Sequence, residues 1–266
     1  DVSFQVGRGE ILGFLGPNSA GKTTTMRILT GYLPATEGHA TIAGFDVFEQ
    51  PLEAKRRTGY LPETPPRYPE MTVAEYLSFV ARLNGVAAGE RNSQVHAAME
   101  RTNIADMQHR YCGTLSKGYR RRVGLAQAIL HNPDVLILDE PTAGLDPRQI
   151  IETRRLIAEL AGERTVILST HILPEVSQPC QRVVIINAGR VVAVATPNNL
   201  TARLQGSQTL YLQVDSLGVD ATAGLASIPG VVNVTTADQQ DGVTGYEVES
   251  HAGDDVRRDL ARTVVS

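Results

Sequence analysis

The chain has 266 residues, with 25 lysines and arginines against 29 aspartates and glutamates, and a formal net charge of −4. Hydrophobic residues make up 42% of the chain and charged residues 20%, a globular composition that excludes a disordered or fibrous protein. The acidic balance argues against a nucleic-acid-binding protein with a broad basic surface, and no uninterrupted apolar run is long enough to span a membrane. Cys112 and Cys180 fit no metal-ligand spacing, so we expect two reduced thiols.

The first predicted element is a strand that begins upstream of the first residue. Val2, Phe4 and Val6 alternate with polar residues, which is typical of a half-buried strand. The chain starts at Asp1 without a methionine, and no basic and apolar regions of a signal peptide follow. We therefore expect a subunit trimmed at its N-terminus and, because the last predicted unit lacks its final strand, at its C-terminus as well.

Short apolar runs bounded by turn residues predict strands that are buried on both faces. Helical segments lie between them, so the predicted fold class is α/β, with a parallel sheet covered by helices. The last two runs flank the turn Asn187–Arg190 and predict a hairpin. The predicted strands are Ile11–Leu15, Val135–Leu138, Val166–Leu168, Val183–Ile186 and Val191–Val194.

A helical subdomain is predicted between the region of Gly59 and the next predicted strand. About 75 residues separate the two, far more than a strand-to-helix connection needs. Thr72 and Glu75 form a capping-box pattern ahead of an apolar run that stops at Gly85. Two further helices, Arg91–Arg101 and Ser116–Leu130, complete a subdomain at about residues 70–132.

After Pro197 the pattern predicts a smaller unit with the order β-α-β-β-α. This order is that of a ferredoxin-like unit without its last strand, although a tail packed on the first domain remains an alternative. We place the boundary between residues 205 and 206. The predicted elements are strand Thr209–Val214, helix Val219–Ser227, strands Val231–Thr235 and Tyr246–Glu249, and helix Asp254–Val264.

Gly16–Thr23 matches the phosphate-binding pattern G-x-x-x-x-G-K-[ST], between a predicted strand and a predicted helix. Backbone N–H groups and the helix N-terminus would cradle phosphate oxygens, and glycine lets the backbone approach them. Lys22 would contact the β- and γ-phosphates, and the Thr23 hydroxyl would bind Mg²⁺. The expected ATP-binding residues are Gly16, Pro17, Asn18, Ser19, Ala20, Gly21, Lys22, Thr23 and Thr24.

Asp139 and Glu140 follow the predicted strand Val135–Leu138. Two carboxylates at the end of a buried strand must coordinate a group or reach a cleft, because burying a free charge is costly. Asp139 is the expected Mg²⁺ residue, and Glu140 would act as general base on the attacking water.

Leu115–Tyr119 opens the third predicted helix of the subdomain. Ser116 is well placed as the N-cap, and the same helix N-terminus with Ser116 and Gly118 is also suited to binding an anion. The residues leave both interpretations open. We expect the following Arg120, Arg121 and Arg122 to form one solvated helix surface.

In this order the motifs resemble those of ATP-binding subunits of ABC transporters. Over residues 1–205 the chain looks most like exporter ATPases of the ABC-2 type, including the gliding-motility-associated group. The resemblance departs at Ser19, Lys117 and Tyr119, where other residues are usual, and at Glu63, where glutamine is usual. The matching segments are Gly16–Thr23 (Walker A), Glu63 (Q-loop), Leu115–Tyr119 (signature), Val135–Glu140 (Walker B), Ala143–Asp146 (D-loop) and His171 (switch histidine).

The resemblance implies a P-loop ATPase core with an antiparallel β-subdomain and the inserted helical subdomain at residues 1–205, followed by an accessory domain at residues 206–266. It implies a Mg²⁺-dependent ATPase in which Lys22, Glu140 and His171 are catalytic. ATP and Mg²⁺ are the implied cofactors, with Thr23, Glu63 and Asp139 around the metal. The adenine-stacking aromatic residue is expected upstream of Asp1.

The resemblance also implies a head-to-tail dimer, expected to be a homodimer, with ATP between the subunits. Asp146 would run along the dimer interface. The partner of this dimer would be a separate membrane permease and not a nucleic acid, so we expect a peripheral protein on the cytoplasmic face of the membrane. The alternatives are a non-transport ABC ATPase acting on nucleic acid or ribosomes, and a binding-only module. The residues expected to face the phosphates bound to the other subunit are Leu115, Ser116, Lys117, Gly118 and Tyr119.

Overall fold

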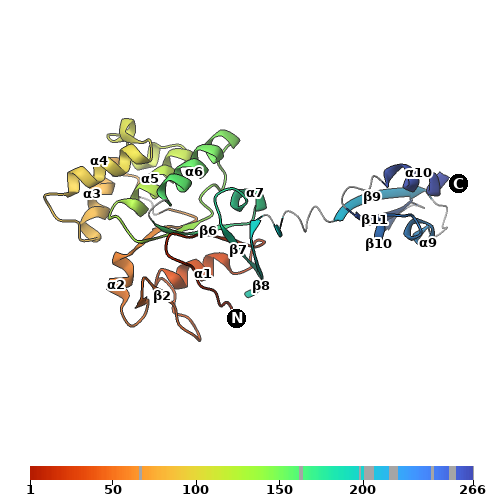
Figure 1. The fold of residues 1–266 in the computed structure, drawn as a ribbon. Coiled ribbons are helices and arrows are strands. Elements are labelled where there is room, and N and C mark those ends of the chain that lie inside the picture. The colour runs from red at the N-terminus through yellow and green to blue at the C-terminus, as the bar shows by residue number, and fades with distance from the viewer. Residues whose placement is uncertain are drawn as a thin grey trace. The chain divides into compact units, whose positions relative to one another are not determined.

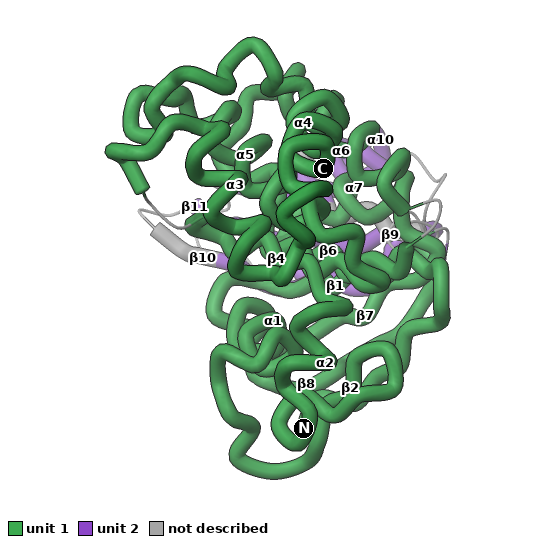
Figure 2. Tube along the Cα trace, turned by 90° about the vertical axis from the view of Figure 1, so that its left-hand side faces the viewer, with its two compact units in different colours: residues 1–197 green, residues 198–266 purple. Residues whose placement is uncertain are grey.

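The computed structural model describes residues 1–65, 68–161, 164–197, 199–200, 207–215, 221–240, 243–251 and 256–265. The chain divides into two compact units, residues 1–197 and 198–266 (Figures 1 and 2). The division at residue 197 precedes the boundary that the sequence predicts at 205, and residues 201–206 lie outside the described part of the chain.

A six-stranded sheet forms the centre of the first unit. Its order is β4-β5-β6-β1-β7-β8, in which all neighbours run parallel except the antiparallel pair β7 and β8. This order differs from the chain order, so segments that are distant in sequence become neighbours. The five predicted strands, the hairpin and the α/β class are confirmed. The bounds are β1 Ile11–Leu15, β4 Thr58–Leu61, β5 Val135–Asp139, β6 Thr165–Thr170, β7 Arg182–Asn187 and β8 Arg190–Ala195.

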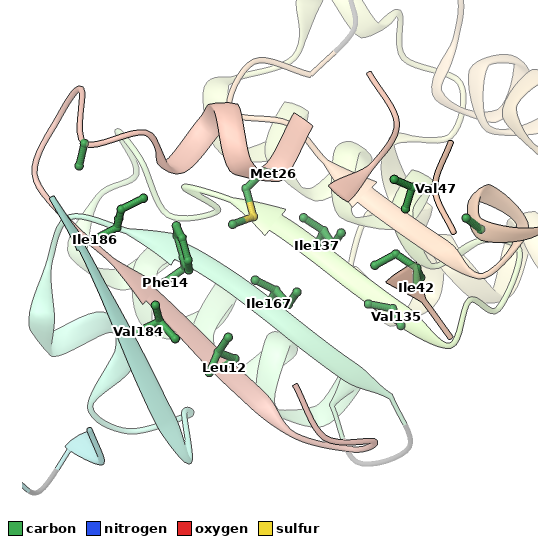
Figure 3. Packing of buried hydrophobic residues seen from close by; sticks show 12 residues of the cluster. Leu12, Phe14, Met26, Ile42, Val47, Val135, Ile137, Ile167, Val184 and Ile186 are labelled. Carbon is green, nitrogen blue, oxygen red and sulfur yellow. The ribbon is translucent and has the colours of Figure 1, made fainter. Parts of the chain in front are cut away.

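Helices cover both faces of this sheet. Helix α1 (Lys22–Leu29) lies below the sheet in Figure 1, and α5 (Lys117–Ile129), α6 (Pro147–Leu160) and α7 (Leu173–Val176) lie above it. Figure 3 shows apolar side chains of β1, β5, β6 and β7 in one cluster with Met26 of α1. Strands β5 and β6 are buried along their whole length, as expected when both faces of a parallel sheet are covered.

The strand predicted at Val2–Val6 is not formed. Val2, Phe4 and Val6 do pack against the core as partly buried residues, with the Phe4 ring 5.3 Å from that of Phe14. The predicted alternation of burial is therefore present. A strand also needs a neighbouring backbone to pair with, and residues 1–7 have only isolated backbone contacts, such as that from Val191 N–H to the Asp1 carbonyl.

A small antiparallel pair and a short helix follow α1 and were not expected individually. The hairpin of β2 (Thr41–Ile42) and β3 (Phe45–Asp46) leads to α2 (Pro51–Arg56). Ile42 and Val47 extend the core beside β5 (Figure 3). Strands of two residues are too short to show a periodic pattern in the sequence.

The three predicted helices of the inserted subdomain are confirmed as α3 (Val73–Leu83), α4 (Arg91–Arg101) and α5. The capping box is present: Thr72 Oγ1 accepts a bond from Glu75 N–H at 3.3 Å, and Glu75 Oε2 accepts one from Thr72 N–H at 2.8 Å. The three helices contact one another, and α5 also lies against β4. Helix α5 thus joins the subdomain to the sheet.

Gly59 allows α5 to lie this close to β4. A Cβ atom at Gly59 would be 2.0 Å from the Ala128 carbonyl oxygen, and a backbone atom cannot move away as a side-chain tip can. We expect Gly59→Ala to lower the free energy of unfolding by about 2–3 kcal/mol, measured by urea denaturation. The control is Gly89→Ala, whose Cβ would meet open space, with an expected change below about 0.5 kcal/mol. Equal stability of the two variants would contradict the close packing.

The second unit has the predicted order β-α-β-β-α. Its antiparallel sheet has the order β10-β11-β9, so β11 lies between the other two strands, as in a ferredoxin-like unit. Leu225, Tyr246, Val248 and Leu260 belong to a hydrophobic core of its own. The bounds are β9 Ser207–Asp215, α9 Thr222–Ala226, β10 Val231–Gln240, β11 Val243–His251 and α10 Arg257–Val265. Across the described parts of the chain, no helix is both long and apolar enough to cross a bilayer.

Candidate active site

Four neighbouring strands bring part of the predicted site to one edge of the sheet. Strands β4, β5, β6 and β1 are parallel, so their carboxyl ends lie together, which is the usual ligand-binding edge of an α/β sheet. Glu63 follows β4, Asp139 ends β5 and Glu140 follows it. His171 follows β6, and the loop Gly16–Gly21 follows β1.

The loop Gly16–Gly21 leads into α1 through residues with positive φ. Gly21 precedes the helix with φ +106°, and Ser19 has φ +66°. Such angles are easy for glycine and strained for serine, which explains why glycine is usual at position 19. Gly16 is required for a different reason, because a Cβ there would be 2.4 Å from the Ile186 carbonyl oxygen of β7.

Lys22 is buried, with 6% of its surface exposed, and its ammonium is held by three oxygen atoms. Nζ donates to the carbonyls of Gly16 at 2.8 Å and Pro17 at 3.1 Å, and it lies 3.3 Å from Glu140 Oε1. The positive charge is therefore fixed inside the loop that the sequence identifies as a phosphate cradle.

Glu140 lies between two basic side chains. Its Oε1 is next to Lys22, and its Oε2 is 3.0 Å from Nδ1 of His171, whose side chain is 40% exposed. The Glu140 backbone has φ +48°, a strained conformation for a residue with a side chain. Ser169 holds this peptide, since its carbonyl and its hydroxyl oxygen both accept from Glu140 N–H, at 3.2 and 3.1 Å.

Asp139 has one carboxylate oxygen without a hydrogen-bond partner among the described residues. The side chain is fully buried, and Oδ1 accepts a bond from the Ser169 hydroxyl, whereas Oδ2 is unsatisfied. A buried unpaired carboxylate oxygen is costly, and carboxylate and hydroxyl oxygens are ligands that suit Mg²⁺. The free oxygen of Asp139 therefore suits such a metal, and the Thr23 hydroxyl is a donor of the same kind at the start of α1.

The signature residues lie beside the D-loop. Ser116 Oγ accepts from Tyr119 N–H at 3.4 Å and caps α5, and Gly118 is buried against the Gln149 side chain.

Asp146 caps α6 by accepting from Gln149 N–H at 2.9 Å, a role that the sequence signals through Pro147 at the next position. A hollow of about 790 Å³ is lined by Gly118, Tyr119, Asp146 and Gln149, among others. Among the described residues, the hydrogen bonds of Ser116 and Asp146 stay at the starts of their own helices and do not reach the loop Gly16–Gly21.

The predicted solvated surface of three arginines is wrong for Arg121. Its side chain is buried, with 5% exposed, and it donates to the carbonyls of Pro62 at 3.0 Å, Glu63 at 2.8 Å and Glu140. Burial lowers its pKa, while the charges of nearby carboxylates oppose that shift. Arg120 is exposed, and Arg122 forms an ion pair with a glutamate of α6. Three adjacent arginines show no difference in sequence, so only the packing distinguishes Arg121.

Glu175 is a second functional-site neighbour that the sequence reasoning missed. It is 3% exposed, and its two carboxylate oxygens accept bonds from the hydroxyls of Thr142 at 2.6 Å and Thr170 at 2.5 Å. Glu175 thus ties the loop after β5 to the end of β6. No local pattern marks it, because its partners come from two other segments.

Glu63 is placed less directly at the site. Its side chain is exposed, and its backbone carbonyl, not its carboxylate, makes the contact with Arg121. Glu63 follows β4, a strand that the sequence did not predict, and a metal-binding role for its carboxylate stays a prediction.

Comparisons with known proteins agree with this arrangement of motifs. A family model described as "ABC transporter" matches residues 1–143, more than half of the chain. The linearmycin resistance ATP-binding protein LnrL of Bacillus subtilis is 32% identical over 88% of this chain and 76% of that protein. The Nod factor export ATP-binding protein I of Burkholderia thailandensis is 38% identical over 75% of this chain and 66% of that protein. A solved ATP-binding subunit of an ABC transporter superposes with a TM-score of 0.69 at 31% identity, covering 77% of this chain and 85% of that one.

Proposed function

The chain belongs to the ABC transporter family as one of its ATP-binding, ATP-hydrolysing subunits, and from this premise we propose that Lys22, Glu140 and His171 form its catalytic centre. The observation that carries the proposal is the contact of the Glu140 carboxylate with both Lys22 and His171 at the carboxyl edge of the sheet. These contacts fix the carboxylate beside the phosphate-binding loop, where it can bond to the attacking water and accept its proton.

Each residue has a separate task in this proposal. Backbone N–H groups of Gly16–Gly21 and the ammonium of Lys22 bind the β- and γ-phosphates. Glu140 orients the attacking water and accepts its proton, and His171 contacts the γ-phosphate. Thr23 and Asp139 would hold Mg²⁺, with Glu63 nearby, and the metal would supply positive charge that neutralises the phosphates.

A second subunit completes the site in this proposal. The signature residues lie at the D-loop of their own chain, and a helix N-terminus of this kind can bind phosphate oxygens. In a head-to-tail dimer, Ser116 and Gly118 of one chain would face the ATP held by Lys22 of the other. Lys117 and Tyr119 would flank this contact, and Asp146 would lie at the interface.

In this proposal the dimer binds a separate membrane permease and powers it. The relatives named above are ATP-binding proteins of resistance and export, which supports transport over a role on nucleic acid or ribosomes. We place the subunit on the cytoplasmic face of the membrane, with export as the direction.

The second unit has a regulatory or dimer-contact role in this proposal. If deletion of residues 206–266 had no effect on ATPase activity, assembly or transport, that result would count against the role.

The dimer gives the proposal a direct test. With Glu140→Gln to slow hydrolysis, MgATP is expected to convert the monomer to a dimer in sedimentation velocity runs, because ATP links the two chains. MgADP, or ATP with excess EDTA, is the control and is expected to leave the monomer. The wild-type chain is expected to release phosphate only when Mg²⁺ is present. A monomer at saturating MgATP would contradict the shared site.

A further inference from the structure

Arg121 joins three segments of the chain through backbone carbonyl groups. It belongs to α5, the helix that the signature residues begin. Its Nη1 donates to the carbonyls of Pro62 and Glu63 after β4, and its Nη2 donates to the carbonyl of Glu140 after β5. A guanidinium carries several N–H donors in a fixed planar fork, so one side chain can satisfy carbonyls on two different segments at once.

The bond to Glu140 falls on the residue whose backbone is strained. Ser169 of β6 holds the Glu140 N–H, and Arg121 holds the Glu140 carbonyl, so the residue is fixed from both sides at φ +48°. This backbone angle aims the carboxylate at Lys22 and His171. A strained backbone persists only where surrounding contacts hold it, and here Arg121 supplies one of those contacts.

We propose that Arg121 is a positioning residue for ATP hydrolysis, which sets the geometry of Glu140. Because Arg121 also bonds to the segment after β4, the geometry of Glu140 depends on how α5 packs against that segment. The inference rests on the proposed role of Glu140 as general base. Arg121 acts through the backbone of Glu140 and has no role in holding the phosphates, which belong to Lys22 and the loop Gly16–Gly21. Its loss therefore affects turnover and spares nucleotide binding.

The test compares turnover with nucleotide affinity in the full chain. Arg121→Met is expected to lower kcat about 10- to 50-fold, because small displacements of a catalytic group have effects of this size. The Kd for a fluorescent ATP analogue is expected to stay within about twofold of wild type. Arg121→Lys, which restores a charged donor without the fork, is expected to recover part of the lost kcat. Arg120→Met, at the exposed neighbour on the same helix, is the control and is expected to match wild type.

A double-mutant cycle separates positioning from general destabilisation. In the Glu140→Gln background, Arg121→Met is expected to reduce the residual single-turnover rate by less than about threefold, since the residue it positions is already inactive. A merely structural role predicts the full 10- to 50-fold loss in both backgrounds, and that result would overturn the inference. A kcat within twofold of wild type in a folded Arg121→Met variant would also overturn it.

Two further measurements keep the interpretation clear. Thermal unfolding checks that each variant is folded. If Arg121→Met does not fold, Arg121→Lys replaces it in the same cycle. A kcat of Arg121→Lys equal to that of wild type would then overturn the inference. Glu140→Gln alone tests the proposed function. If that variant hydrolyses ATP normally, the proposed function fails; if it is inactive while Arg121→Met is normal, only the inference about Arg121 fails.

Discussion

Glu140→Gln is expected to reduce ATP hydrolysis about 100- to 1,000-fold while ATP binding is kept, since general-base catalysis contributes effects of this order. Glutamine has the shape of glutamate and can still bond to a water molecule. It carries no negative charge and accepts no proton at neutral pH, so the water is held but not activated.

The surroundings of Glu140 make this substitution a clean test. The Glu140 carboxylate is 3.3 Å from Lys22 Nζ and 3.0 Å from His171 Nδ1. Removing its charge also removes an anion beside the phosphate site, so ATP affinity is expected to stay equal or to rise. This separates loss of chemistry from loss of binding.

Phosphate release gives kcat for this variant, and fluorescence titration with an ATP analogue gives Kd. Glu37→Gln, the same exchange at an exposed residue, is the control and is expected to behave as wild type. Undiminished hydrolysis by Glu140→Gln would contradict the assignment of the general base.

Lys22→Ala is expected to weaken ATP binding by about 100-fold or more, because truncation removes one partner of a buried, charge-assisted contact. Lys22 is the buried cation held by the Gly16 and Pro17 carbonyls inside the loop. Without it, the phosphates would meet two carbonyl oxygens and the Glu140 carboxylate with no positive side chain between them.

The measurement is the Kd of MgATP by fluorescence titration, together with phosphate release at saturating ATP. Lys55→Ala, which removes an exposed lysine of α2, is the control and is expected to leave Kd unchanged. Lys22→Arg keeps the charge on a larger, planar group that does not fit between the same carbonyls, so only part of the affinity is expected to return. A Kd within threefold of wild type for Lys22→Ala would contradict the proposed role.

The sequence by itself determined most of the local structure. The capping box at Thr72, the helix Arg91–Arg101 and the buried strand Ile11–Leu15 depend on residues close together in the chain, so their patterns were readable. The same holds for the order of elements after Pro197. The motif Gly16–Thr23 was recognisable because its chemistry requires particular residues at fixed spacing.

The tertiary structure decided what depends on distant segments. The strand order put β5 and β6 between β4 and β1, and this placed Glu140 between Lys22 and His171. Residues 2–6 have the alternation of a strand, but no backbone pairs with them, so they form none. Arg121 looks like its two neighbours in the sequence, and only the packing of α5 directs its side chain to three backbone carbonyls. Periodicity reports which face of an element is buried, whereas the partner of a buried charge is set by how separate elements pack together.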